Sequence, residues 1–385
     1  MGHVIKIRGR LAAAAAAALL LASASTASAA VVQSTPTPTW QTNGRVLSIQ
    51  IVGSVAYIGG KFTSVRPAGD PAGTGEVTRN HAAAIDLSTQ TLLPWNPNTS
   101  GTVQTIAVSG STVYLGGSFG MVGGKSHKDI AAVDATSGAP LASFKAKANA
   151  EVLTVQVASG NVYAGGQFTT MDGTAVGFLA AVDPATGALN TGWSGTADAE
   201  VLTSTLTPDG SRLVIGGDFT HVDGASQNHI ASLAPATGAT QSWTTHTPYA
   251  VVALSSDSTG VFVAGAGSGG NFAGFSQTGA MLWQGGTNGN VQAIAVMDSV
   301  VYVGGHYTDY CGPQGGQHTC TNPIARSKLL AVDETTGTLN TTWHPAANST
   351  LGVFALDGSG GRLALGGDFT KLAGVAQQGF GEFVE

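Results

Sequence analysis

Charged residues are scarce in this 385-residue chain, where only 10% of positions are Asp, Glu, Lys or Arg. The few charges are mostly acidic, with 22 acids against 16 basic residues and a formal charge of −6. Proteins that bind nucleic-acid phosphates need clustered lysines and arginines, so this composition argues against a nucleic-acid partner. With only two cysteines, a multi-disulfide framework is excluded. After the first 30 residues, no apolar run reaches the length that a membrane-spanning helix requires.

The first 30 residues have the features of a secretory signal peptide. A basic start precedes an uninterrupted Ala/Leu run at residues 11–21, and small residues at 27–29 provide a cleavage site. The basic residues are Lys6, Arg8 and Arg10. We therefore predict that residues 1–30 are removed and that the mature protein is secreted, either free or associated with the cell wall. Its formal charge would then change from −6 to −9, because three basic residues and no acids are lost.

The two cysteines, Cys311 and Cys320, lie in one glycine-rich stretch. In a secreted protein such a pair is expected to form a disulfide that closes the loop between them. A zinc site is the alternative, with His306 and His318 as the nearest additional ligands. We expect the disulfide, and we predict no bound metal.

Glycine is abundant, with 55 residues, and many of them belong to one repeating pattern. A Gly-Gly pair is followed by an aromatic residue, an Ala-Val-Asp-like strand end, a Thr-Gly turn and a final aromatic. The pairs are Gly59-Gly60, Gly116-Gly117, Gly165-Gly166, Gly216-Gly217, Gly304-Gly305 and Gly366-Gly367, with a degraded copy at Gly265-Ala266. The final aromatics are Trp40, Trp95, Phe144, Trp193, Trp243, Trp283 and Trp343. Seven units of about 50 residues predict a closed repeat architecture.

Within one unit, the pattern predicts four short antiparallel strands. In the fourth unit these are residues 201–206, 213–219 and 229–233, followed by a short strand that ends at Trp243. No segment after residue 30 has the 3.6-residue periodicity of a helix. We therefore predict an all-β fold: a seven-bladed β-propeller of four-stranded antiparallel blades, which forms a single domain over residues 31–385.

The two ends of the mature chain are complementary. Residues 37–40 supply a fourth strand without a third, and residues 381–385 supply a third strand without a fourth. We predict that the N-terminal strand completes the seventh blade, which residues 353–356 and 363–369 begin, and so removes the open sheet edges. The fifth unit lacks the second glycine and the long loop, so we expect a small blade there.

Several repeated residues have a structural interpretation. A glycine pair in a strand indicates a bulge or a close backbone approach. Four aspartates each open a turn whose N–H groups can donate to the carboxylate, which favours turn capping over catalysis. They are Asp86, Asp134, Asp183 and Asp333. The tryptophans are expected to pack between neighbouring blades.

Length varies between units mainly in the connection from the second to the third strand, which predicts long loops on one rim of the propeller. Binding residues usually lie on such loops. The residue after each glycine pair belongs to different polar classes in different units, whereas its neighbours barely change. Several histidines lie near the start of the third strand. Our candidate ligand-binding residues are Lys61, His81, His127, Asp218, His229, His306 and Asp368. The alternative is that these side chains simply face water.

The combination of Gly-Gly-x-Phe-Thr, as at residues 59–63, with Ala-Ala-Val-Asp, as at residues 131–134, and a later Trp resembles a known repeat family. It is the β-propeller repeat of exported bacterial proteins, many of them actinobacterial and of unknown function. The pattern is also similar to delta-sixty repeats and to the propellers of fungal cortical polarity markers. The resemblance covers residues 40–385 and implies the fold, not a chemistry. The Asp-x-x-Thr-Gly portion also resembles the tryptophan-docking motif of quinoprotein dehydrogenases, but the adjacent cysteine pair of that family is absent, so we predict no cofactor.

No catalytic motif occurs in a context that supports it, so we predict no catalytic residues. We expect a non-enzymatic, monomeric binding module whose partner is an extracellular glycan, a cell-wall component or an exported protein. The alternative is a propeller hydrolase or lyase that acts on an extracellular polysaccharide, with histidines and carboxylates of the loop rim converging on the central channel. Two such groups within hydrogen-bond reach at the channel mouth would favour the enzyme, and an aromatic-lined groove would favour a glycan ligand.

Overall fold

The computed structural model describes residues 1–2, 31–267, 269–313 and 320–385. These residues form strands and turns without a helix, as the missing 3.6-residue periodicity predicts. The predicted signal peptide lies outside the described residues, apart from its first two positions. None of the described segments is a helix long and apolar enough to cross a membrane.

Most strands belong to antiparallel sheets in which consecutive strands pair. The first strands are β2 (Val46–Val52), β8 (Thr102–Ser109), β13 (Val152–Ala158), β18 (Val201–Leu206), β24 (Val251–Ser256), β28 (Val291–Met297) and β33 (Val353–Ser359). The second strands are β3 (Val55–Gly60), β9 (Thr112–Ser118), β14 (Asn161–Gly166), β19 (Leu213–Gly217), β25 (Val261–Gly265), β29 (Val300–Gly305) and β34 (Arg362–Gly367). The third strands are β6 (Ala82–Asp86), β12 (Ile130–Asp134), β17 (Leu179–Val182), β22 (Ile230–Leu233), β26 (Asn271–Phe275), β32 (Leu329–Asp333) and β37 (Phe380–Val384).

The fourth strand is the least regular part of each sheet. It is formed by β7 (Thr91–Leu92), β23 (Thr240–Gln241) and β27 (Met281–Thr287) in three of the described sheets. Beside β12, β17 and β32 it is reduced to one bridge each: Val133–Pro140, Val182–Leu189 and Val332–Leu339. Pro140 has no N–H to offer a ladder, which is one reason why pairing stops there.

The connections between second and third strands form small hairpins in most units, where we expected irregular loops. The hairpins are β4–β5 (Ser64–Arg66, Val77–Thr78), β10–β11 (Met121–Val122, Lys125–Ser126), β15–β16 (Thr170–Met171, Thr174–Ala175), β20–β21 (His221–Val222, Ala225–Ser226), β30–β31 (Asp309–Gly312, Ile324–Ala325) and β35–β36 (Lys371–Leu372, Val375–Ala376). Most are also paired to the segment that leads into a first strand: β4 pairs with β1 (Gln41–Thr42), and Thr99 pairs with Val122. Strands of two residues are too short to produce an alternating pattern, which is why the sequence did not reveal them.

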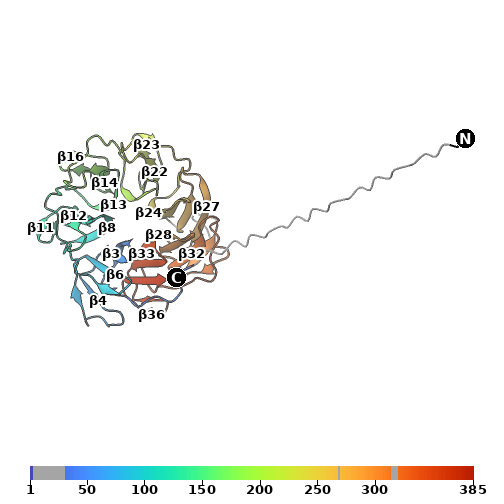
Figure 1. Ribbon diagram of the computed structural model, residues 1–385, viewed down its shortest axis with the longest axis horizontal. Helices are drawn as coiled ribbons and strands as arrows, with labels where there is room; N and C mark the ends of the chain where they lie inside the picture. Colours follow the sequence, from blue (N-terminus) through green and yellow to red (C-terminus); the bar gives the residue numbers. More distant parts are fainter. Residues whose placement is uncertain (3–30, 268, 314–319) are drawn as a thin grey trace.

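The sheets surround a common centre, with the first strands innermost (Figure 1). These inner strands contact one another in chain order, from β2 through β8, β13, β18, β24 and β28 to β33. β33 in turn contacts β2, so the last inner strand lies beside the first. The core is divided into clusters between neighbouring sheets, as where Tyr57 of β3 packs with Val103 of β8.

The first glycine of each pair makes room for the next sheet. A Cβ on Gly59 would lie 2.6 Å from Cγ1 of Val103, a residue of the following inner strand. The same relation joins the last sheet to the first, because a Cβ on Gly366 would lie 2.6 Å from Cγ1 of Val46. Glycine is therefore required where a β-branched side chain of the neighbouring sheet fills the space.

The second glycine of each pair makes room for backbone of its own sheet. A Cβ on Gly217 would lie 2.1 Å from the carbonyl oxygen of Glu200. At this point the register between β18 and β19 shifts between Val201 and Thr203. The bulge and the close backbone approach predicted from the glycine pair are confirmed.

The tryptophans and turn aspartates connect neighbouring sheets. Trp95 is fully buried, and its indole N–H donates to the carbonyl oxygen of Asp134 in the turn of the next sheet, at 3.0 Å. The Asp134 carboxylate accepts the backbone N–H groups of Thr136 and Ser137, at 3.1 and 2.7 Å. Both structural interpretations, inter-sheet packing for the tryptophan and turn capping for the aspartate, are confirmed here.

The N-terminal segment after residue 30 lies along the last sheet. Thr37 forms an isolated antiparallel bridge with Glu382 of β37, and the Gln33 N–H donates to the Val384 carbonyl oxygen at 2.7 Å. Upstream of these contacts, the Val32 N–H donates to the Tyr302 hydroxyl at 3.1 Å.

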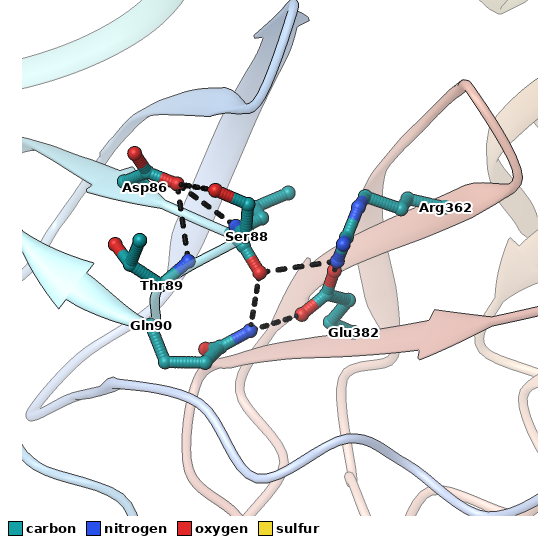
Figure 2. A network of polar contacts seen from close by, with 7 residues as sticks. Asp86, Ser88, Thr89, Gln90, Arg362 and Glu382 are labelled. Carbon is teal, nitrogen blue, oxygen red and sulfur yellow. Dashed lines mark hydrogen bonds and ion pairs between the residues drawn. The ribbon is translucent and has the colours of Figure 1, made fainter.

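A polar network joins the first and last sheets (Figure 2). Glu382 is fully buried, and Arg362 Nη1 donates to its carboxylate at 2.5 Å. Gln90 Nε2 donates to the other carboxylate oxygen at 2.8 Å. Arg362 and Gln90 both also donate to the carbonyl oxygen of Leu87, which belongs to the turn after β6. Figure 2 shows Asp86 capping the same turn through the N–H groups of the residues that follow it.

The fifth sheet is not small, so that expectation was wrong. It runs through β24, β25, β26 and β27 and continues into the hairpin β30–β31 of the next unit. Only a short connection follows Gly265, and β26 starts at Asn271, so β26 and β27 pair along five register positions. β27 has seven residues, whereas the fourth strands β7 and β23 have two each.

Cys311 and Cys320 form the predicted disulfide. The two cysteine sulfurs are therefore bonded to each other and cannot bind zinc as thiolates. Within the described part of the chain, no group of three or more His, Cys, Asp and Glu side chains could hold a metal ion. His318, the other ligand considered, lies outside the described residues.

Candidate functional site

A cavity of about 490 Å³ lies at the centre of the molecule, lined by residues of every inner strand from β2 to β33. The bulge in each inner strand inserts one extra residue between two paired ones. The inserted residues line the cavity and are half-buried: Leu47, Gln104, Leu153, Leu202, Val252, Gln292 and Phe354. Five of these seven are apolar. Hydroxyl and amide side chains, among them Ser48, Thr154 and Asn290, also line the cavity, so its wall is mixed in polarity and contains one aromatic ring.

The residues after the glycine pairs surround the mouth of this cavity. In most blades this residue donates its backbone N–H to the carbonyl that precedes the inner strand of its own sheet, as in Lys61 to Arg45 at 2.8 Å. His306 makes the same bond to Asn290, which lines the cavity, and Ala266 lines the cavity itself. In the fifth unit Gly265 pairs with Val251 and so holds the position of the second glycine, not of the first as we expected, which makes Ala266 the residue after the pair. The mouth ring, as we name this set, consists of Lys61, Ser118, Gln167, Asp218, Ala266, His306 and Asp368. Four of our seven candidates, Lys61, Asp218, His306 and Asp368, thus occupy equivalent positions, each directly after the second strand of its sheet.

Charge is distributed unevenly around the mouth ring. On one side, Glu151 accepts a hydrogen bond from the Gln104 amide at 2.7 Å, and Glu200 accepts one from the Gln167 amide at 3.1 Å. These carboxylates are joined to amides, so their contacts do not form the acid–base pair that an enzyme site would need.

On the opposite side of the mouth, Arg45 forms an ion pair with Asp368 at 3.8 Å. The Arg45 guanidinium lies over the Phe354 ring, 4.4 Å from its centroid. This cation–π contact holds the arginine at the edge of the cavity.

His81 and His229 do not line the central cavity, and their rings contact the backbone of the second glycines. Both adopt positive φ, 65° in each case, at the residue that precedes the third strand. The Nδ1 atom of His81 lies 3.2 Å from the Gly60 carbonyl oxygen, and that of His229 lies 3.1 Å from the Gly217 carbonyl oxygen. Asp129 takes the same backbone position, with φ of 64°, in another unit. Burial lowers the pKa of the His81 imidazole, although the contact with the Gly60 carbonyl oxygen acts in the opposite direction.

His127 lies away from the mouth ring. It is buried, with 7% of its surface exposed, and it lines a second cavity of about 500 Å³ beside the hairpin β10–β11. Burial, together with the nearby charge of Lys147, lowers the pKa of His127.

A second set of repeated residues escaped the sequence analysis. The Asn149 carboxamide oxygen accepts the backbone N–H groups of Thr169 and Thr170, both at 2.9 Å, and its Nδ2 donates to the Thr169 hydroxyl. The same contacts are made by Asn43, Asn288 and Asn348. In the fourth unit Asp198 replaces the asparagine, and its carboxylate additionally lies 3.0 Å from His221 Nδ1. The signal was present, since an Asn or Asp precedes most of the Gly-Gly-x-aromatic-Thr motifs by a nearly constant interval.

Asp357 is a titratable group at the junction of the first and last inner strands. It belongs to β33, and its carboxylate accepts the Ile51 N–H of β2 at 2.6 Å. Burial raises the pKa of the Asp357 carboxyl to about 7, although the N–H groups of Ile51 and Gly358 act in the opposite direction. The folded protein therefore holds a proton here that the unfolded chain releases near pH 4.

This carboxyl predicts a pH dependence of stability. Because the pKa is higher in the folded state, its contribution to stability is fully present below pH 4 and is lost as pH rises through 7. Between pH 5 and pH 8 the free energy of unfolding should fall by about 2 kcal/mol through this group. Urea unfolding at both pH values should show that decrease in the native protein and a clearly smaller one in Asp357→Asn. Equal decreases in the two proteins would contradict the assignment.

No family model matches this chain, and no curated protein sequence matches it. Solved structures, however, are similar to this chain in fold. The WD40 β-propeller domain of Doa1 is similar with a TM-score of 0.57 and 12% identity, covering 91% of this chain and 97% of that domain. The computationally designed Ika8 protein is similar with a TM-score of 0.54 and 14% identity, covering 90% of this chain and 98% of that protein. The chain has a WD40-like β-propeller fold.

In this β-propeller the sheets are the blades, and the mouth ring surrounds one end of the central channel. The similarity at 12–14% identity shows the fold alone. A propeller is a typical interaction scaffold, because rigid blades present variable residues on one face.

Proposed function

We propose that the mature chain is secreted and forms a single closed propeller of seven blades, and that it acts as a non-enzymatic interaction module. Closure is supported by the contact of β33 with β2 and by the space that Gly366 leaves for Val46. The bridge between Thr37 and Glu382 supports the role of the N-terminal segment in the last blade. The disulfide fits an oxidising, extracellular compartment.

The observation that carries the proposed function is the central cavity, to which the inserted residues of five inner strands contribute apolar side chains, together with its polar mouth. The exposed side chains of Lys61, Asp218 and His306 differ in charge, while the glycines and aromatics next to them are repeated. A scaffold that varies at such a mouth is suited to selecting a partner.

The chemistry of the cavity favours a protein partner over a glycan. Sugar rings are usually bound on aromatic faces, and Phe354 is the single aromatic side chain among the residues that line this cavity. Aliphatic side chains such as Leu153 and Leu202 suit an apolar side chain inserted by a partner. We propose an exported protein that inserts an apolar residue into the cavity while its flanking residues contact the mouth ring.

Selection of a random peptide library against the purified protein tests this proposal. The selected peptides should share an apolar anchor residue, and their affinity should fall about tenfold in Leu202→Gln. That variant is expected to fold, because Gln104 and Gln292 occupy the equivalent positions of other blades. Asp218→Lys should alter which flanking charges are selected.

The matched control is Ala185→Glu, which adds a charge in a turn on the face opposite the mouth ring and should leave peptide binding unchanged. Peptide binding that is insensitive to both Leu202→Gln and Asp218→Lys would overturn the proposed site. Selection of glycans alone, from an array screened in parallel, would overturn the proposed class of partner. Hydrolysis of a polysaccharide that is lost in Glu200→Gln would instead support the enzyme alternative.

A further inference from the structure

The second cavity, of about 500 Å³, lies at the outer side of the propeller. Its walls are the hairpin β10–β11 and the segment that follows β12, from Pro140 to Lys147. It is lined by Gly123, Lys125, Ser126, His127, Pro140, Ala142, Phe144, Lys145, Ala146 and Lys147. We call it the lateral cavity.

The lateral cavity concentrates positive charge in a protein that has little of it. Four of the eight lysines of the chain fall within residues 125–147, and Lys125, Lys145 and Lys147 line the cavity. No acidic residue is among the lining residues. None of these three lysines forms an ion pair in the part of the chain that the structure describes.

One carboxylate does lie close to this cluster. Asp172, in the turn between β15 and β16, accepts the backbone N–H of Lys147 at 2.9 Å. Its oxygen is thus directed at the backbone, and it does not line the cavity. Burial raises the pKa of this carboxyl, and the charge of Lys147 acts in the opposite direction. The two groups form no ion pair among the residues that the structure describes, so the ammonium group can still contact an external anion.

His127 supplies a buried polar group at the same cavity. Only 7% of its surface is exposed, and across the described residues neither of its ring nitrogens has a hydrogen-bond partner within the protein. Its backbone N–H is already bonded to the Gly120 carbonyl oxygen at 3.0 Å, which fixes the position of the residue. The ring nitrogens are not among the fully buried polar atoms that lack a partner, so they reach the open space of the cavity and can contact a ligand there.

We propose that the lateral cavity binds the phosphate group of a phosphorylated sugar or polyol. The lysines would neutralise the phosphate charge, and the imidazole N–H of His127 would donate to one of its oxygens. This site is separate from the mouth ring and does not depend on the function proposed for it.

The residue types favour phosphate over carboxylate. Arginine recognises planar carboxylates through two parallel hydrogen bonds, and no arginine lines this cavity. Lysine is a point charge that accommodates a tetrahedral phosphate from several directions. The volume exceeds that of the anion alone, and the Pro140 and Ala142 side chains offer apolar surface to the carbon part of an ester.

Titration calorimetry with glycerol 3-phosphate, inorganic phosphate, acetate and glycerol tests the proposal. Both phosphate compounds should bind with a dissociation constant on the order of 1 mM, whereas acetate and glycerol should bind at least about tenfold more weakly. Tighter binding of the ester than of inorganic phosphate would support a phosphorylated polyol as the natural ligand, and the reverse order would overturn that choice in favour of free phosphate.

The double variant Lys145→Gln, Lys147→Gln should weaken phosphate binding about tenfold or more. Lys371→Gln is the matched control, because it removes one exposed lysine from the equivalent hairpin region of another blade and should change nothing. His127→Phe should also weaken binding, and an unchanged thermal midpoint of the lysine variants shows that folding is retained. Absence of saturable phosphate binding, equal binding of acetate, or equal weakening by Lys371→Gln would each overturn the proposal, whatever the outcome at the mouth ring.

Discussion

Replacing Gly217 by alanine should lower the free energy of unfolding by about 3 kcal/mol or more. A Cβ at this position would lie 2.1 Å from the carbonyl oxygen of Glu200, which belongs to the backbone of the same blade. A side chain could rotate away from such a contact, but a backbone oxygen at a bulge cannot move without breaking the pairing of β18 with β19. Chemical denaturation of the variant and the native protein measures the loss.

Two further variants show whether the space, rather than the loss of glycine, is responsible. Gly192→Ala is the matched control, since its nearest neighbour would be the Asn190 side chain at 3.4 Å, and its stability should change by no more than about 0.5 kcal/mol. Gly216→Ala should also be destabilising, because its Cβ would meet Val251 Cγ1 at 2.4 Å, but adding Val251→Ala should restore part of the stability. A Gly217→Ala protein as stable as the Gly192→Ala protein would contradict the role assigned to the glycine pairs.

Replacing Arg362 by alanine should destabilise the protein by about 3–5 kcal/mol, because it leaves the buried Glu382 carboxylate without its cation. The Arg362 guanidinium also donates to the Leu87 carbonyl oxygen at 3.1 Å, so the variant loses a connection between the first and last blades. Of the original contacts to the carboxylate, the Gln90 amide at 2.8 Å would remain. Chemical denaturation of Arg362→Ala and the native protein measures the difference in the free energy of unfolding.

A double-mutant cycle with Glu382→Gln separates the ion pair from packing effects. The double variant Arg362→Ala, Glu382→Gln should be more stable than Arg362→Ala alone, because it no longer buries an unpaired charge. Hydrogen exchange should accelerate first in β37 and in the turn after β6, where the network joins the two blades. A loss spread evenly over all blades, with no gain from the second substitution, would show that this junction is not a weak point of the ring.

The repeat made the fold predictable from sequence. The spacing of Gly-Gly, Asp-x-x-Thr-Gly and Trp depends on contacts that recur in most units, so a pattern along the chain reports them directly. The hairpins of the rim, such as β10–β11, were missed because two-residue strands produce no alternation. The fifth blade was misjudged because a short connection was equated with a small sheet, whereas in the structure β27 extends to β30.

The candidate site could be predicted only in part from the sequence. Lys61, Asp218, His306 and Asp368 occupy one repeated position, and the ring they form follows from the repeat. His81 and His229 were chosen for their residue type, and the structure places their rings against the Gly60 and Gly217 carbonyl oxygens. His127 looked equivalent to them in sequence but lies in a separate cavity.

The sequence by itself determined the repeating strands, the turn caps, the glycine pairs and the disulfide, because each depends on residues that are near one another in the chain or on a motif that recurs. The tertiary structure decided which polar side chains share a surface and which are used internally. It also decided that the bulged residues of separate strands line one central cavity and that three lysines meet one buried histidine. These arrangements depend on how blades distant in sequence are oriented around a common centre, and the order of the residues does not encode that orientation locally.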